Sequence, residues 1–282
     1  MYCVAIGGCI VTPAVTPQAD IGVLFMHNEG YSTMCGHGII GLVTVLLETG
    51  AFAAKGRQTP LNLDTPAGLV RATAHLDESG HVEQVSFLNV PSFLYVRDLE
   101  INVPAFGRVK VDIAFGGAFY AILPAQQLGL RVTPEQTEQL VVAGEAIKAV
   151  INATLPIKHP VEADLSFLYG TILTDTPEDP AHHSRNICVF ANGEVDRSPT
   201  GTGVSARLAL HHAKGEIVEG QQIVIESILG AKSAFSGRVV ERTRVGPHAA
   251  IVPEVCGSAY IVGRNEWMID PRDALGQGFL AS

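Results

Sequence analysis

Charged residues are scarce in this sequence, and basic residues are scarcer than acidic ones. Charged residues make up 17% of the 282 positions, and 19 Lys and Arg against 28 Asp and Glu give a net charge of −9. This balance, without a long basic cluster, argues against nucleic acid as a partner. Long apolar runs are also lacking: the longest strongly apolar stretch, residues 39–47, is far shorter than the roughly 20 residues that a membrane span needs. We therefore expect neither a nucleic-acid nor a membrane partner.

The five cysteines form no CxxC pair and are odd in number. This usage is typical of a reducing compartment, so we expect a cytoplasmic protein without a disulfide framework or a zinc site. The charged lead-in of a secretory signal is missing too. The pairs His182-His183 and His211-His212 lack the HExxH spacing of a zinc-binding helix, so we expect no metal ligands there.

The sequence does contain a cysteine between turn residues, just before its most apolar run. Residues 39–47 are apolar on every side of a helix, which is typical of a buried helix, and Gly50 provides a stop signal. Cys35 would then lie at the first turn, where unpaired N–H groups and the helix dipole favour a thiolate. The same N–H groups would donate hydrogen bonds to a ligand carboxylate. An inert, buried structural cysteine is the alternative interpretation.

A second copy of this arrangement begins at Thr200. When Cys35 is placed over Thr200, three glycines of each segment coincide, Gly36, Gly38 and Gly50 with Gly201, Gly203 and Gly215. Such a long period is not that of a solenoid, so it predicts two homologous halves that face each other across a cleft. The N-termini of the two helices would then meet at one ligand.

The rest of the sequence is rich in predicted strands and poor in helices. Alternating or clustered β-formers predict strands at residues 21–26, 60–64, 69–75, 83–88, 108–115, 118–123, 164–175, 187–191, 222–226, 237–241, 249–253 and 258–263. Thr133, Pro134 and Gln136 match a capping box and predict a helix that runs to about residue 151. The order indicates an α+β fold of two halves, residues 1–115 and 116–264, each an open or barrel-like sheet around one long helix.

Two polar residues and one glycine-rich stretch near these segments are further candidates for chemistry. His37 would donate to a ligand carboxylate or stabilise the thiolate, with a capping or core histidine as the alternative. Asp196, which precedes Arg-Ser-Pro, is either a surface turn residue or a partner for a ligand cation. Residues 201–203 resemble part of a phosphate loop but lack the Lys-Ser/Thr that follows it, so we expect no nucleotide there.

Two long motifs carry a resemblance to a known family. Residues 25–38, FMHNEGYSTMCGHG, resemble the first active-site motif of the proline racemase family, and residues 196–203, DRSPTGTG, resemble the second. The likeness extends over most of the chain and includes residues 169–175 and Asp270-Pro271. It implies a diaminopimelate epimerase-like fold of two pseudo-symmetric halves, each a curved, mostly antiparallel sheet wrapped on a central helix. The active site would lie between the halves, and residues 265–282 would return to the first half.

The resemblance also implies a reaction. Racemases and epimerases of the family carry a cysteine in both motifs, and this chain has Thr200 in the second, as in the trans-3-hydroxy-L-proline dehydratase branch. A threonine hydroxyl is too weak an acid to protonate the opposite face of the substrate, whereas elimination needs only one base. The implied reaction forms Δ1-pyrroline-2-carboxylate and water from this imino acid, without a cofactor or a metal.

The family pattern assigns roles to the other motif residues. Cys35 would remove the Cα proton and Asp196 would hold the substrate ammonium. For Thr200 we expect a hydrogen bond to the departing hydroxyl, which is our own hypothesis. The substrate carboxylate would lie on N–H groups of the two helix starts, Gly36 and His37 in the first and Gly201 and Thr202 in the second. These groups would also stabilise the negative charge that develops on the carboxylate in the transition state.

Two other functions remain open from the sequence. The first is a proline racemase or a 4-hydroxyproline 2-epimerase, against which Thr200 argues. The second is a truncated, catalytically impaired family member, because relatives carry a further sheet-forming segment upstream of the position matching Met1. The first half would then lack strands, and the helix at residues 38–49 would expose apolar surface. A homodimer is the assembly that the sequence leaves open beside a monomer.

Overall fold

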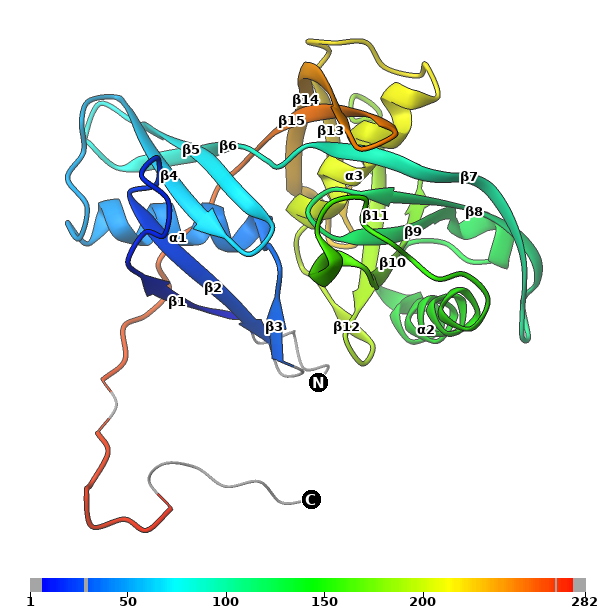
Figure 1. The fold of residues 1–282 in the computed structure, drawn as a ribbon, viewed down its shortest axis with the longest axis horizontal. Helices are drawn as coiled ribbons and strands as arrows, with labels where there is room; N and C mark the ends of the chain where they lie inside the picture. Colours follow the sequence, from blue (N-terminus) through cyan, green and yellow to red (C-terminus); the bar gives the residue numbers. More distant parts are fainter. Residues whose placement is uncertain (1–6, 28–29, 267, 276–282) are drawn as a thin grey trace.

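The computed structural model describes residues 7–27, 30–266 and 268–275, which form two lobes (Figure 1). The first lobe comprises β1 (Gly8–Thr12), β2 (Ile21–His27), β3 (Gly30–Ser32), α1 (Gly36–Glu48), β4 (Gln58–Thr65), β5 (Gly68–Leu76) and β6 (Val82–Leu88). The second lobe comprises β7 (Ser92–Val103), β8 (Gly107–Phe115), β9 (Phe119–Pro124), α2 (Thr137–Thr154), β10 (Leu168–Asp175), β11 (Ser184–Phe190), β12 (Glu194–Val195), α3 (Gly201–Ala213), β13 (Ile223–Ser227), β14 (Gly230–Val245) and β15 (His248–Gly257).

The same order of elements occurs once in each lobe. In the first, β1 and β2 are antiparallel, β3 pairs with β2, and α1 connects to β4, which is parallel to β2. In the second, β10 and β11 are antiparallel, β12 pairs with β11, and α3 connects to β13, which is parallel to β11. Two further antiparallel strands complete each copy, β5 and β6 in one and β14 and β15 in the other. The sheet is therefore mixed, with few helices.

The final strands of the two copies join the lobes. β6 and β15 pair antiparallel, with Phe87 opposite Val255, so one sheet runs through the whole molecule. An apolar cluster crosses the same junction and includes Ile40 of α1 and both Val204 and Leu208 of α3. Strand pairing and a shared core therefore hold the N-terminal ends of α1 and α3 at the junction.

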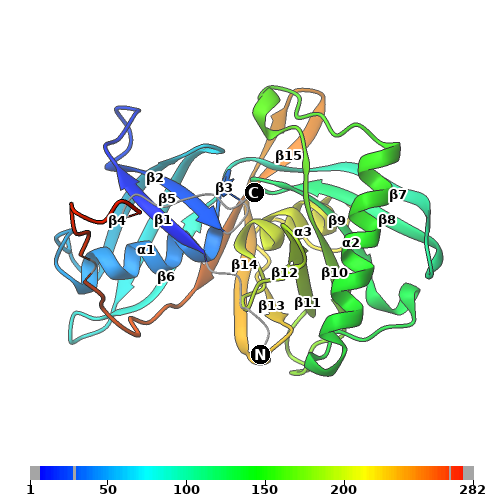
Figure 2. The same ribbon diagram turned by 90° about the horizontal axis from the view of Figure 1, so that it is seen from below.

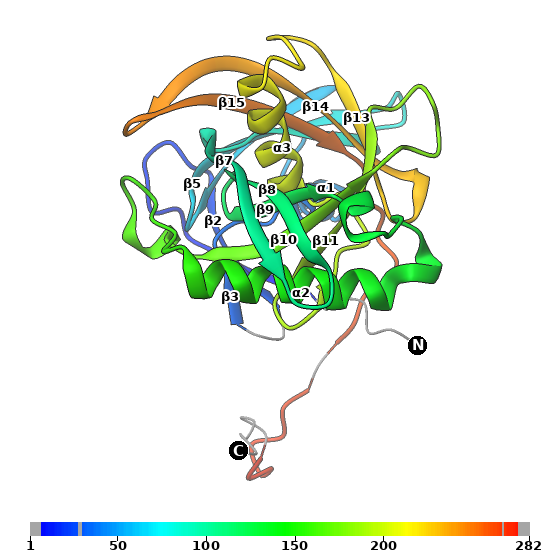
Figure 3. The ribbon, with the colours of Figure 1, turned by 90° about the vertical axis from the view of Figure 1, so that its right-hand side faces the viewer.

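The second lobe closes into a barrel around α3. β7 pairs with both β8 and β15, which closes the ring β7-β8-β9-β10-β11-β13-β14-β15. Every residue of α3 from 201 to 210 is buried inside this ring (Figure 3). Helix α2 lies outside the ring against β10 and β11. The barrel thus places the start of α3 in a fully packed environment.

The first lobe is open, and α1 is covered on one face only. β1 has a partner on one edge, and Ile10 and Val11 are each 46% exposed. α1 packs against β5 and β6 (Figure 2). Ile39, Ile40 and Val43 of this helix are buried, whereas Val45 is 43% exposed. The interpretation of residues 39–47 as a fully buried helix is therefore wrong for the outer face of α1.

Most predicted strands and both glycine-stopped helices are confirmed, with three differences. Residues 134–136 form a 3-10 turn before α2, and the Thr133 side chain makes no capping hydrogen bond. Residues 258–263 carry no regular structure. β7 was not predicted, because two register shifts and a positive φ at Asp98 break its two-residue alternation.

The boundary at residues 115 and 116 also differs from the observed arrangement. β7 and β8 pair in sequence with β9 and pack in one core with α2, so these strands belong to the second lobe. The chain passes from β6 to β7 through residues 89–91, and it is there that it leaves the first lobe.

The chain beyond β15 runs first along the first lobe. Ala259 packs against the apolar cluster that crosses the junction of the lobes, whereas residues 265, 266 and 268–275 are exposed. The return of residues 265–282 to the first half stays a prediction, and 276–282 lie outside the described residues, as do Asn28 and Glu29 of the first motif. Within the described part of the chain, no helix is both long enough and apolar enough to span a membrane.

Candidate active site

The N-termini of α1 and α3 touch each other, as the sequence repeat predicts. A Cβ atom placed on Gly36 would lie 2.5 Å from the Cα of Gly201, and one placed on Gly201 would lie 2.6 Å from the Cα of Gly36. Phe87 closes the remaining space, since its Cζ would lie 2.9 Å from the first of these atoms. Only glycine at both positions lets the two helices meet, which is the physical reason for this pair in the repeat.

The second pair of aligned glycines lies in close packing, each beside the residue that precedes its helix. A Cβ on Gly38 would lie 2.7 Å from Cε1 of Phe25 and 3.2 Å from the Cβ of Cys35. One on Gly203 would lie 2.7 Å from Cδ1 of Ile172 and 3.3 Å from the Cβ of Thr200. Cys35 and Thr200 are the N-cap residues of α1 and α3, and neither side chain makes a capping hydrogen bond. The first N–H groups of both helices have no acceptor within their helix. The sulfur and these donors are therefore at one junction.

A hydrogen-bonded network crosses this junction and centres on Asp196. Its Oδ2 lies 3.0 Å from His37 Nδ1 of the first lobe and accepts a hydrogen bond from Thr200 Oγ1 at 3.0 Å. Its Oδ1 accepts the backbone N–H of Ser198 at 2.9 Å. The Asp196 side chain is 4% exposed, against 43% for His37. Asp196 is thus a buried junction residue, which rules out the surface-turn interpretation.

The charges of this network support one another. The negative charge of Cys35 raises the pKa of His37 well above its usual value, burial lowers it, and Asp196 raises it further. Burial raises the pKa of Asp196, but the charge and hydrogen bond of His37 and the bonds from Ser198 together hold it below its usual value. Opposite charges in contact favour each other's ionised form. The arrangement therefore places a sulfur, an imidazole and a carboxylate in series, with the imidazole between the two acidic groups.

Thr200 has an unusual backbone conformation. Its φ is 69° and its ψ is 105°, in a region that β-branched residues rarely adopt, whereas Cys35 has an ordinary extended φ of −136°. The N–H of Thr200 donates to Ser198 Oγ at 3.0 Å. Backbone strain of this kind is typical of functional sites.

Several residues near the network were not predicted. Ser198 lies in the second motif but was assigned no role from the sequence, although its hydroxyl lies 3.3 Å from His37 Nδ1. The rings of Tyr169 and Phe190 stack with their centroids 5.5 Å apart, and the His27 ring contacts both edge-on. Burial and then the Cys35 charge raise the pKa of Tyr169. Tyr169 and His27 were noticed only because they lie in stretches that resemble the family. Aromatic residues on a strand normally indicate only a hydrophobic core.

Thr202 and the paired histidines have other partners. Tyr120 and Thr202 share a buried hydrogen bond of 2.6 Å between their hydroxyls, so the Thr202 hydroxyl is bonded to β9 of the barrel wall. His182 Nδ1 lies 2.9 Å from Glu226 Oε1. His211 contacts Arg207 inside the barrel.

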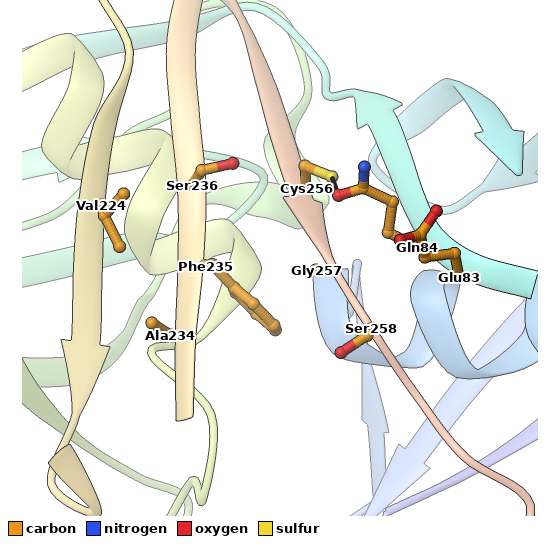
Figure 4. Close-up of a pocket in the computed structure, with 9 residues that line it drawn as sticks. All are labelled: Glu83, Gln84, Val224, Ala234, Phe235, Ser236, Cys256, Gly257 and Ser258. Atoms are coloured by element: carbon orange, nitrogen blue, oxygen red, sulfur yellow. Dashed lines mark hydrogen bonds between the residues drawn. The ribbon is translucent and has the colours of Figure 1, made fainter. Parts of the chain in front are cut away.

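A separate groove of about 320 Å³ lies between β6, β14 and β15 (Figure 4). Gln84, Phe235 and Cys256 line it, and the Cys256 thiol donates to Gln84 Oε1. Burial raises the pKa of this thiol to about 11. No residue of either motif lines the groove, so it is distinct from the junction of the two helices.

Comparison with known proteins agrees with this geometry. The family model described as proline racemase matches residues 4–280. The chain is 47% identical over 273 residues to the trans-3-hydroxy-L-proline dehydratase of Colwellia psychrerythraea. This alignment covers 97% of this chain and 76% of the relative. The chain is 42% identical over 273 residues to the proline racemase of Clostridioides difficile, with coverage of 97% and 81%.

A solved structure is similar as well. The crystal structure of a hydroxyproline epimerase from Agrobacterium vitis, with bound trans-4-hydroxy-L-proline, superposes with a TM-score of 0.89 at 33% identity and covers 97% of this chain and 77% of that one. The two matched motifs, the repeat that they begin and these likenesses lead to one conclusion: the chain belongs to the proline racemase family.

Proposed function

We propose that this protein dehydrates trans-3-hydroxy-L-proline to Δ1-pyrroline-2-carboxylate and water, with Cys35 as the base. The observation that carries the proposal is the pairing of one thiol with one alcohol, Cys35 and Thr200, at two helix N-termini that touch. The names of similar proteins support it, because relatives called trans-3-hydroxy-L-proline dehydratase are 46–47% identical to this chain. The substrate class is thus a small imino acid.

The proposed first step is removal of the α-proton. The substrate carboxylate binds to N–H groups of Gly36, His37, Gly201 and Thr202, which also stabilise the charge that builds up on it. The Cys35 thiolate takes the proton from Cα, and the C–H electron pair moves onto the carboxylate. The ammonium, which acidifies Cα, is held near Asp196.

The second step expels the hydroxyl. In trans-3-hydroxy-L-proline the C3 hydroxyl lies opposite the carboxylate and therefore on the same ring face as the Cα proton. The newly protonated Cys35 thiol is on that face and returns the proton to the leaving oxygen, as the electron pair forms the C2–C3 double bond. One water and one cyclic enamine result, and the enamine tautomerises to the pyrroline. This stereochemistry assigns protonation of the leaving hydroxyl to Cys35, in place of the hydrogen bond from Thr200 that we expected from the sequence.

Thr200 explains why the proposed reaction is elimination and not inversion. Its hydroxyl proton is already donated to Asp196 Oδ2, and the hydroxyl is too weak an acid to protonate a carbanion. A racemase or epimerase needs a donor at this position. The racemase and epimerase alternatives therefore lack a residue to carry them.

The finer features of the proposal follow from the same chemistry. We propose that the lobes are pseudo-symmetric halves with the site between their central helices, that the reaction uses no cofactor or metal, and that it takes place in the cytoplasm. The acid–base groups at the junction, a thiol, an imidazole and a carboxylate, are sufficient for proton transfer. The homodimer stays a prediction.

The test is an assay of the full chain with trans-3-hydroxy-L-proline, in which o-aminobenzaldehyde traps the pyrroline. We expect an adduct with this isomer and at most a weak signal with cis-3-hydroxy-L-proline, whose hydroxyl lies on the other ring face. Incubation of L-proline with the protein in D₂O should yield no D-proline that carries deuterium at Cα. A folded sample that forms no adduct, or one that inverts L-proline, would reject the proposal.

A further inference from the structure

Arg207 lies in the centre of the barrel and is 2% exposed. Its Nη1 donates to Asn186 Oδ1 at 3.1 Å, and its Nη2 donates to Ser184 Oγ at 2.7 Å and contacts His211 Nε2 at 3.2 Å. Its Nε has no hydrogen-bond partner among the described residues, and no carboxylate there forms an ion pair with it. A buried guanidinium without a carboxylate is unfavourable for folding. Its position therefore calls for an explanation other than stability.

The partners of Arg207 keep it charged and directed. An arginine only donates, so His211 accepts at Nε2 and carries its proton on Nδ1, toward Glu216. Burial and then Arg207 lower the pKa of His211, which keeps this ring neutral. Burial lowers the pKa of Arg207 to about 10, so the guanidinium stays positive at neutral pH.

A chain of hydrogen bonds runs from this cation to the candidate active site. Asn186 accepts from Arg207 with its oxygen and donates with Nδ2 to the carbonyl of Pro199 at 3.1 Å. That carbonyl belongs to the peptide bond whose N–H, on Thr200, donates to Ser198 Oγ at 3.0 Å. Ser198 in turn contacts His37. Successive bonds of this kind polarise one another in a buried setting.

The peptide at the middle of this chain is the one that needs support. Rotation of the 199–200 peptide plane sets φ of Thr200, and a β-branched residue at 69° returns to negative φ unless its surroundings hold it. Asn186 is the side chain that holds the carbonyl side of that plane, and Ser198 holds the N–H side. Arg207 fixes the orientation of the Asn186 amide.

We propose that Arg207 is a positioning residue for the active site: through Asn186 it fixes the 199–200 peptide and keeps the Thr200 hydroxyl directed at Asp196. Its side chain touches neither substrate nor thiol. The kinetic test of this proposal rests on the proposed dehydration. The effect on the backbone conformation of Thr200 can be tested without it.

The test compares Arg207→Lys with Ser184→Ala. Lysine keeps the charge but not the fork that reaches Asn186, whereas the serine variant removes another hydrogen bond of the same guanidinium and leaves the Asn186 bond in place. We expect kcat/KM for trans-3-hydroxy-L-proline to fall tenfold or more in Arg207→Lys, mainly through kcat, and less than threefold in Ser184→Ala. Both melting curves are measured first, and Asn186→Ala replaces Arg207→Lys if the lysine variant does not fold.

Two readouts separate positioning from a general loss of structure. The double variant Arg207→Lys/Asn186→Ala should be no less active than Asn186→Ala, because both changes break one chain. A crystal structure of Asn186→Ala should have Thr200 at negative φ. Equal activity of the lysine and serine variants, multiplying losses in the double variant, or an unchanged φ would overturn the proposal. A wild-type chain without dehydratase activity would instead reject the proposed function, and the crystal structure would still decide the role of Asn186.

Discussion

The two lobes contain the same order of strands and helix, yet only the second is closed. β7, β8 and β9 complete the ring around α3, and the described first lobe has no counterpart of these strands around α1. As a result α3, which contains Thr202, Ser205 and Arg207, is buried from residue 201 to 210, whereas the more apolar α1 exposes Val45. Burial of a helix thus follows from what surrounds it and only partly from its own sequence.

The open and the closed lobe also contribute different kinds of residue to the candidate active site. The open lobe brings the half-buried thiol of Cys35 and the exposed side of His37. The closed lobe brings Asp196 and Thr200, each fixed by several hydrogen bonds. A rigid frame that orients groups and an accessible group that reacts are complementary requirements of catalysis.

The largest expected effect comes from exchanging the two N-cap residues for serine. Cys35→Ser should lower kcat by about 10³-fold, because an alcohol is a poor base at neutral pH. Thr200→Ser keeps a hydroxyl at this position and should change kcat by less than about tenfold. Steady-state kinetics of the two folded variants measure this. Similar losses in both would mean that the lobes do not differ in their chemical roles.

Two glycines of α1 distinguish the junction from the open side of the same helix. Gly36→Ala places a Cβ 2.5 Å from the Cα of Gly201 and should lower the free energy of unfolding by about 2–3 kcal/mol. Gly41→Ala meets no atom within 4 Å and should raise it by about 0.5–1 kcal/mol through helix propensity. Urea denaturation compares the two. A neutral Gly36→Ala would contradict the contact between helix ends.

Two valines of α1 test how far the open lobe leaves its helix uncovered. Val43 is 0% exposed, so Val43→Ala should lower the free energy of unfolding by about 2 kcal/mol. Val45 is 43% exposed, and Val45→Ala should change it by less than about 0.5 kcal/mol. Thermal and urea unfolding report both. A large loss in Val45→Ala would reveal a partner on the outer face of α1.

The smallest effect is the pH dependence of the link between lobes. The raised pKa of His37 means that the stabilising charge is fully present below the ordinary histidine value of about 6.5 and is lost as the pH rises through the raised folded value. The lowered pKa of Asp196 acts at the other end, where stability is lost as the pH falls through that lowered value. Melting temperatures of wild type and His37→Gln across pH 6–10 should converge as the pH rises. A constant difference would show that no titration of His37 links the lobes.

The local parts of the fold were predictable, and the long-range parts were not. Glycines in register marked both helix starts, and alternation marked β8 and most other strands, because these signals lie within a few residues. β7 was missed because its bulges break the alternation, and the lobe boundary was misplaced with it. Cys35, His37, Asp196 and Thr200 were singled out from sequence, and their roles in catalysis stay predictions.

The sequence by itself determined the pair of helix starts, the family and the identity of the two N-cap residues, since each depends on neighbouring letters or on a repeat. Only the tertiary structure decided that one helix is enclosed and the other half open, that Asp196 joins His37 to Thr200, and that Arg207 reaches the site through Asn186. The physical reason is that ring closure and buried hydrogen-bond chains depend on which distant segments pair, and such pairing leaves no local periodicity in the chain.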